Sequence, residues 1–173
     1  MSHVMLDLET LGTTPGCAIV SIGACSFDAN GLGEEFYRVI DITAPGASGS
    51  IDPSTVKWWM GQSDEARAVF AAAGIPLDSA LHNFSGFWRR VGGTLLWGHG
   101  AARVLRPILD AAFSRCGLQA PVKFWDYRDT RTLYALADVK PERTAGTHHN
   151  ALDDAKAQAL AVIQGYKNLG KSL

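Results

Sequence analysis

The stretch VMLDLETLGTTPGCAIVSIGACSF, residues 4–27, decides the fold. Its two apolar runs are separated by the turn-forming segment LGTTPG and followed by DANG, a pattern that predicts a hairpin-like pair of strands. A third strand is predicted near residues 36–40, before a loop rich in Pro, Gly and Ser at residues 43–50. Three early strands imply a sheet.

The rest of the chain alternates helical patterns with short strands. Pro53 and Ser54 are expected to begin a helix, and Ser63 to be the N-cap of a second one. Later patterns predict helices at 78–91, 107–116 and 150–169, and strands at 94–97 and around Phe124 and Trp125. This order predicts an α/β fold with three layers, in which helices flank a mixed central sheet.

Size and composition indicate a single domain, residues 1–173. The chain is 47% hydrophobic and 19% charged, which excludes general disorder. Sixteen basic and 17 acidic residues give a net charge of -1, so any polyanion must be bound locally rather than by a global positive field. Three widely spaced cysteines argue against disulfides and zinc, and Asp7 and Glu9 interrupt the N-terminal apolar run. We therefore expect reduced cysteines, a cytoplasmic location and no membrane partner.

Asp7 and Glu9 are the first candidate metal ligands. They lie two residues apart at the end of the first predicted strand, so the period of two places both carboxylates on one side. Such hard oxygen ligands suit Mg²⁺ or Mn²⁺ better than zinc. The alternative is a solvated acidic pair at a strand end.

The segment HHNALDDA supplies a second candidate cluster. His149 precedes Asp154 by five residues where the last helix begins, so the two side chains can converge. His148 and Asp153 repeat this spacing one residue earlier, and helical periodicity does not separate the two pairs. The alternative is that the two aspartates stabilise the N-terminus of the helix through its dipole.

Six segments together resemble the DEDD superfamily of 3'-5' exonucleases. They occur in the family's order over most of the chain: LDLETLG from Leu6, CAIVSIGACSFD from Cys17, TVKWWMGQSDEAR from Thr55, LLWGHGA from Leu95, WDYRDTRTL from Trp125 and HHNALDDA from His148. The most similar branch is the single-domain group that contains ribonuclease AS and phage exonuclease A, within the histidine (DEDDh) branch.

The resemblance implies a ribonuclease H-like fold and phosphodiester hydrolysis with two Mg²⁺ or Mn²⁺ ions. Asp7 is expected to bridge the ions, and Glu9 and Asp154 to complete the shell of the ion that holds the attacking water. His149 is expected to be the general base. Two such ions lower the pKa of water and stabilise the attacking and leaving oxygens.

The resemblance also implies substrate-binding positions. Leu8 and Thr10 are expected to hold the terminal nucleotide, and Trp59, rather than its neighbour in the helix, to border the groove where a base stacks. Arg128 and Arg131 suit phosphate, although a solvated turn with internal ion pairs explains them equally well. The expected partners are single-stranded RNA or DNA 3' ends, with RNA slightly favoured, and a homodimer is compatible with the composition.

The chain departs from the family where the second motif normally supplies an aspartate. The sequence WGHGAARVLRPILD has no acid between His99 and Asp110, and Val104 or Leu105 stands at the expected place. Either Asp110 or Asp129 replaces this carboxylate, or catalysis is weakened and the protein is a nucleic-acid-binding or regulatory module. A hydrolase of free nucleotides or dinucleotides is a third hypothesis.

Overall fold

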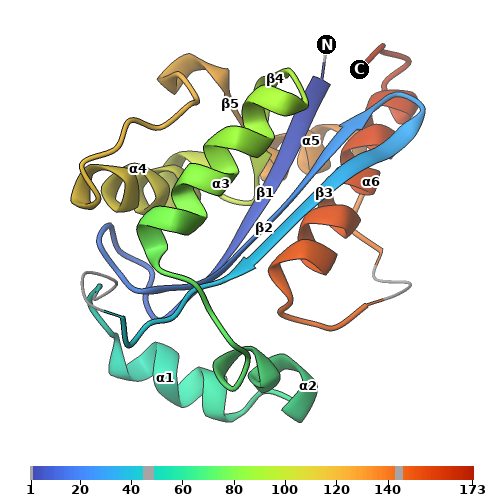
Figure 1. The fold of residues 1–173 in the computed structure, drawn as a ribbon. Coiled ribbons are helices and arrows are strands. Elements are labelled where there is room, and N and C mark those ends of the chain that lie inside the picture. The colour runs from blue at the N-terminus through green and yellow to red at the C-terminus, as the bar shows by residue number, and fades with distance from the viewer. Residues whose placement is uncertain (1, 45–48, 143–145) are drawn as a thin grey trace.

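A five-stranded mixed sheet forms the centre of the computed structural model, which describes residues 2–44, 49–142 and 146–173 (Figure 1). The spatial order is β3-β2-β1-β4-β5. The first three strands pair antiparallel, while β4 and β5 run parallel to β1. The bounds are β1 Ser2–Thr10, β2 Ile19–Asp28, β3 Gly31–Val39, β4 Gly93–Gly98 and β5 Tyr127–Asp129. The predicted mixed sheet and its early hairpin are confirmed.

Helices cover both faces of the sheet, which confirms the three predicted layers (Figure 1). One face packs against α3 and α4, and the other against α5 and α6. Val4 and Leu6 of β1 are buried on the α3 and α4 side, and Met5 between them is buried on the α5 and α6 side. These helices are α3 Leu77–Arg90, α4 Arg106–Arg115, α5 Thr130–Ala137 and α6 Ala151–Asn168.

Two short helices lie at the end of the sheet where β1 finishes (Figure 1). Asp52 caps α1, Pro53–Met60, by accepting a hydrogen bond from the Ser54 amide, and Ser63 caps α2, Asp64–Arg67. A short 3₁₀ helix, η1 (Ala68–Phe70), continues α2. The predicted starts of both helices are confirmed.

The prediction of a strand around Phe124 and Trp125 is wrong. These residues form a 3₁₀ turn, η3 (Phe124–Asp126), and β5 begins one residue later. Phe124 and Trp125 are 65% and 57% exposed, so their apolar character does not reflect a place in the sheet. Part of the loop expected at 43–50 lies outside the described residues, since 45–48 are not described.

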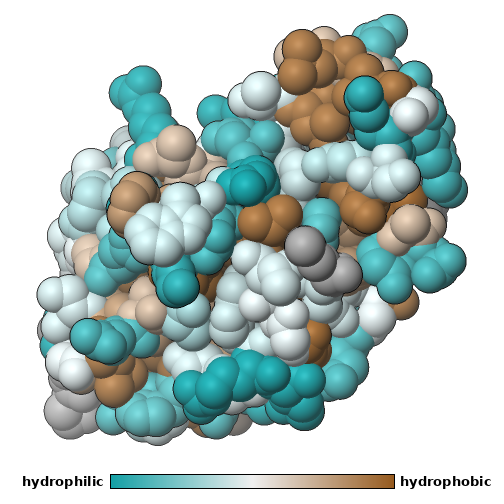
Figure 2. Space-filling view, turned by 90° about the horizontal axis from the view of Figure 1, so that it is seen from above, coloured by the Kyte–Doolittle hydropathy of each residue, from teal (hydrophilic) through white to brown (hydrophobic). Residues whose placement is uncertain are grey.

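The end of the molecule that carries both termini has a mixed surface. Hydrophilic residues cover much of it, and hydrophobic residues gather mainly toward one edge (Figure 2). Among the described residues, no helix combines the length and apolar character needed to cross a bilayer. Cys17, Cys25 and Cys116 are free thiols, the first two of them buried, as expected.

Candidate active site

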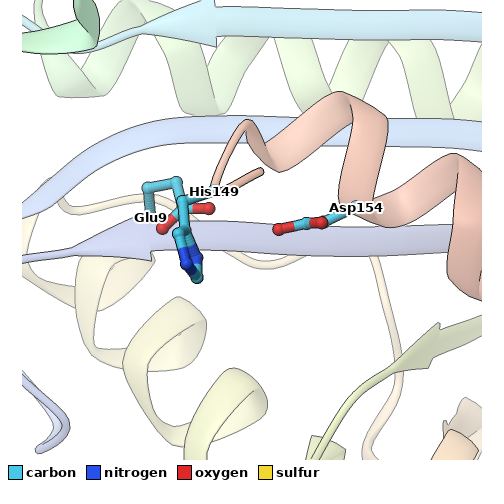
Figure 3. Close-up of side chains that lie close together, drawn as sticks. All are labelled: Glu9, His149 and Asp154. Carbon is cyan, nitrogen blue, oxygen red and sulfur yellow. The ribbon is translucent and has the colours of Figure 1, made fainter. Parts of the chain in front are cut away.

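Three predicted residues converge at one point in the structure. One ligand atom from each of Glu9, His149 and Asp154 lies within 4.8 Å of the other two. Asp154 extends from α6 toward Glu9 on β1, and His149 approaches from the loop before α6 (Figure 3). Residues 140 positions apart in the chain thus form one compact cluster.

The burial of this cluster explains why a cation suits it. Glu9 and Asp154 are each only 7% exposed, and His149 is half-buried. Two buried carboxylates this close repel one another, and a divalent cation neutralises both. The two carboxylates supply the hard oxygen ligands that suit Mg²⁺ or Mn²⁺, and the imidazole lies beside them.

The local backbone positions His149 and Asp154. Asn150 is the N-cap of α6 and accepts hydrogen bonds from the amides of Leu152 and Asp153. His149 has a φ of 61°, a left-handed conformation that turns the chain into the helix. The side chain of Asp154 then projects from the first turn of α6 toward β1.

The structure separates the two aspartates that periodicity left unresolved. The Asp153 carboxylate accepts a 2.8 Å hydrogen bond from the Thr147 amide and so closes the loop before α6. Asp154 instead faces Glu9 and His149. The helix-start interpretation therefore fits Asp153, and the ligand interpretation fits Asp154.

Asp7 lies beside this cluster on the same face of β1. Val4 and Leu6 point to the opposite face, so the expected alternation of side chains is confirmed. The Asp7 carboxylate accepts a 3.1 Å hydrogen bond from Nε2 of Gln158 on α6. Asp7 also faces Gly23 on β2, where the backbone of α6 approaches so closely that a Cβ would lie 2.1 Å from the carbonyl carbon of Ala151.

Two tryptophans of α1 surround His149. The Trp58 ring centroid is 4.7 Å from that of His149, and the Trp59 centroid is 6.2 Å away. Trp58 is 45% exposed, whereas Trp59 is 3% exposed and donates a hydrogen bond to the Thr10 carbonyl. Trp59 thus holds the strand end, and Trp58 presents its ring to solvent.

The comparison with family models identifies the chain. The model of the 3'-5' exoribonuclease Rv2179c-like domain matches residues 2–165. The chain belongs to this family. It is a DEDD-type 3'-5' exonuclease domain with a ribonuclease H-like fold, as the sequence predicted. No curated protein matches the chain in sequence.

Solved structures of exonucleases share the fold at low identity. Exonuclease X in complex with 5' overhanging duplex DNA is 17% identical, with a TM-score of 0.63 over 98% of this chain and 93% of that one. Product-bound exonuclease I is 18% identical, with a TM-score of 0.61, and this chain spans 43% of it. The Mg²⁺- and Mn²⁺-bound Pop2p of S. pombe is 12% identical, with a TM-score of 0.55 over 95% of this chain and 82% of that one.

The second-motif segment of this exonuclease domain has an irregular backbone. Residues Ala101–Leu105 form a π-helix, η2, which runs directly into α4. A π-helix accommodates an extra residue within a helical turn and so shifts the side chains that follow. Leu105 is buried in the core, and the partly buried Val104 packs against the same core.

The two proposed replacements for the missing acid have other contacts. Asp110 accepts hydrogen bonds from Arg106 at 3.1 Å and from the Tyr127 hydroxyl at 3.4 Å. Asp129 caps α5 by accepting from the Arg131 amide at 2.9 Å. The compact cluster of described acidic and histidine side chains contains neither of them.

The predicted arginines lie near the turn that follows β4. Arg131 is exposed, and its Nε donates a 3.0 Å hydrogen bond to Nε2 of His99, whose Nδ1 lies 3.1 Å from the Thr130 hydroxyl. Because Nε2 accepts from Arg131, the neutral ring carries its proton on Nδ1. Arg128 donates to the carbonyls of Trp125 and Tyr127, so it supports the chain before and within β5.

Two residues at this site were not predicted from the sequence: Gln158 was not considered, and Trp59 was preferred to Trp58 as the residue bordering the groove. Gln158 follows Asp154 by four residues on α6, a spacing that already places both side chains on one helix face. The exposure of Trp58 could not be read from the sequence, because it depends on which side of α1 meets the strand end.

Proposed function

We propose that this domain is a Mg²⁺- or Mn²⁺-dependent 3'-5' exonuclease that acts on single-stranded nucleic-acid ends, with RNA slightly favoured over DNA. The observation that carries the proposal is the cluster of Glu9, His149 and Asp154 at the end of β1. The description of the family as exoribonuclease-like supports the RNA preference.

The described carboxylates would hold two ions. Asp7 would bridge them, and Glu9 and Asp154 would complete the shell of the ion nearest His149. Bound divalent ions would lower the pKa of a water molecule and stabilise the attacking and leaving oxygens. Pop2p, which shares the fold, has been solved with Mg²⁺ and Mn²⁺ bound.

His149 would act as the general base. Its imidazole reaches the cluster from the loop before α6 and packs against the edge of Trp58. A neutral imidazole accepts a proton near neutral pH, so His149 would take the proton of the water that attacks phosphorus. The bond from phosphorus to the 3' oxygen of the preceding nucleotide would break, this oxygen would take a proton from a solvent water, and the terminal nucleotide would leave with its 5' phosphate.

The strand end would lie beside His149 and Trp58. A hollow of about 210 Å³ lies next to His149 and Asn150, with Tyr37 and Glu65 also in its lining. The exposed face of Trp58 would stack on a base. Trp59 is buried, so its ring is less accessible to a base than that of Trp58. Leu8 and Thr10, which flank Glu9, would contact the terminal nucleotide.

Arg128 and Arg131 would contact phosphates farther along the strand. The exposed guanidinium of Arg131 is available for this at the β4 end of the site. Exonuclease X and exonuclease I, which share the fold, have been solved with DNA. A homodimer is part of the proposal, and light scattering tests it.

The alternative function is a nucleic-acid-binding module with weakened catalysis. The absence of an acid in the π-helix Ala101–Leu105 favours it, because no carboxylate there supports the second ion. This module would retain oligonucleotide binding in a gel shift and release no product during long incubation with Mn²⁺.

The decisive test uses 5'-labelled single-stranded RNA and DNA of one sequence, incubated with Mg²⁺, Mn²⁺ or EDTA. We expect a metal-dependent ladder that shortens from the 3' end. Asp154→Asn should abolish this ladder because it removes a buried ligand charge, and Asp7→Ala and His149→Ala should do the same.

Asp153→Asn is the matched control. The new amide oxygen still accepts from the Thr147 amide, so the loop before α6 should stay closed and hydrolysis should continue. A wild-type rate in Asp154→Asn contradicts the proposed metal centre. Binding without any ladder supports the module instead.

A further inference from the structure

Gln158 joins α6 to Asp7 from within the protein. It follows Asp154 by one helical turn and is 8% exposed. Its Nε2 donates a 3.1 Å hydrogen bond to Oδ1 of Asp7, and its main-chain carbonyl accepts a 3.1 Å bond from the Tyr134 hydroxyl. The Tyr134 bond thus holds the main chain of α6 at this position, and the Asp7 bond holds the side chain.

The amide oxygen of Gln158 has no hydrogen-bond partner among the described residues. Buried polar atoms in folded proteins are nearly always hydrogen-bonded, so this oxygen calls for a partner that the chain itself does not supply. The planar amide holds the oxygen close to Nε2, and Nε2 is held by Asp7. The unpaired acceptor therefore lies at the Asp7 side of the candidate metal centre.

The orientation of the amide follows from the chemistry of Asp7. An ionised carboxylate only accepts hydrogen bonds, so the nitrogen of Gln158, rather than its oxygen, must face Asp7. A purely structural link between α6 and β1 needs only that one bond. The amide oxygen is thus left to accept a hydrogen bond from a donor that arrives with the metal ion.

We propose that Gln158 is a positioning residue for the metal centre: its N–H group orients Asp7, and its oxygen accepts a hydrogen bond from a water molecule bound to the ion that Asp7 holds. This inference rests on the proposed metal-dependent function. It gives the centre an additional oxygen acceptor from α6, whereas the second-motif segment, Ala101–Leu105, carries no acid. A neutral amide supplies the hydrogen bond without the negative charge.

The test measures Mn²⁺ binding by titration calorimetry on the full chain without nucleic acid. Gln158→Met keeps the length and removes both polar ends, so Mn²⁺ affinity should fall about tenfold. Gln158→Glu keeps an acceptor oxygen for the water molecule but loses the N–H donor to Asp7. Its Mn²⁺ affinity should therefore lie above that of Gln158→Met and should not exceed that of the wild type. Gln164, exposed on the same helix and bonded to Asn168, provides the controls Gln164→Met and Gln164→Glu, which should bind as the wild type does.

The two substitutions separate positioning from a structural role. If the amide oxygen plays no part, Gln158→Glu binds Mn²⁺ no better than Gln158→Met, and that result overturns the inference. Wild-type affinity in Gln158→Met also overturns it. Asp154→Asn, measured beside them, tests the metal centre itself. If this variant binds Mn²⁺ as well as the wild type, the proposed function fails. If Asp154→Asn loses binding while Gln158→Met binds as the wild type does, only the inference about Gln158 is refuted.

Discussion

The indole Nε1 of Trp59 donates a 2.9 Å hydrogen bond to the carbonyl oxygen of Thr10, which fastens α1 to the strand end that carries Glu9. Trp59→Phe removes this donor from a ring that is 3% exposed. We expect the free energy of unfolding to fall by about 1–3 kcal/mol, since the carbonyl of the half-buried Thr10 loses its partner. Urea denaturation measures the change, and a variant as stable as the wild type contradicts the role assigned to this bond.

Trp58 should affect substrate binding more than stability. Its ring is 45% exposed and lies 4.7 Å from the His149 ring. If a base stacks on it, Trp58→Ala should raise KM by about tenfold, within the range measured for single base-aromatic contacts. Steady-state kinetics on a labelled oligonucleotide measure this change. Trp58→Phe keeps an aromatic face and should recover most of the affinity. Equal KM values in Trp58→Ala and the wild type refute the stacking role.

The sequence predicted those features of the fold and the site that depend on residues close together in the chain. Strand alternation placed Asp7 and Glu9 on one face, and the apolar pattern predicted a helix at 150–169, close to the observed bounds of α6, because both patterns depend on neighbouring residues. The choice between Asp153 and Asp154 depends on how α6 is rotated against β1. That rotation is set by contacts between distant segments, which periodicity alone does not contain.

Three elements were not predicted from the sequence, because their formation depends on more than residue type and periodicity. Phe124 and Trp125 are apolar but exposed, so composition alone suggested a strand where a 3₁₀ turn occurs. The unpredicted helix α5 begins at the Asp129 cap, a signal that its neighbouring arginines obscured. The π-helix Ala101–Leu105 depends on backbone hydrogen bonding that residue types do not specify.

Gly23 sets the distance between α6 and the sheet. A Cβ at this position would lie 2.1 Å from the Ala151 carbonyl carbon and 2.2 Å from the Leu152 nitrogen, both of them backbone atoms. Gly23→Ala must therefore move the start of α6, which carries Asp154, away from β1. We expect a loss of about 1–3 kcal/mol in unfolding free energy and weaker Mn²⁺ binding.

Gly86→Ala is the matched control for Gly23→Ala. Gly86 lies within α3, where an added Cβ would meet no other atom within 4 Å. Alanine is the better helix former, so this variant should gain about 0.5–1 kcal/mol and bind Mn²⁺ normally. Thermal denaturation and calorimetry test both variants. Unchanged Mn²⁺ affinity in Gly23→Ala would show that the helix position does not govern the cluster.

His3 should make stability depend on pH at the opposite end of the sheet. Burial lowers the pKa of its imidazole from the ordinary 6.5, and the positive charge of Arg128 adds to the effect. Its Nδ1 accepts a 3.1 Å hydrogen bond from the Trp97 indole, which requires an unprotonated nitrogen. Between the lowered pKa and 6.5 the unfolded chain binds more protons than the folded one, so stability falls as the pH drops below 6.5.

The variant His3→Asn isolates this contribution, because asparagine keeps a hydrogen-bond acceptor and does not titrate in this range. We expect Tm, measured by calorimetry from pH 8 to pH 5, to fall less steeply in His3→Asn than in the wild type. His82→Asn, at an exposed position on α3, should follow the wild-type curve. Parallel curves for His3→Asn and the wild type would mean that His3 does not couple protonation to folding, because the pH dependence then belongs to titratable groups that both proteins share.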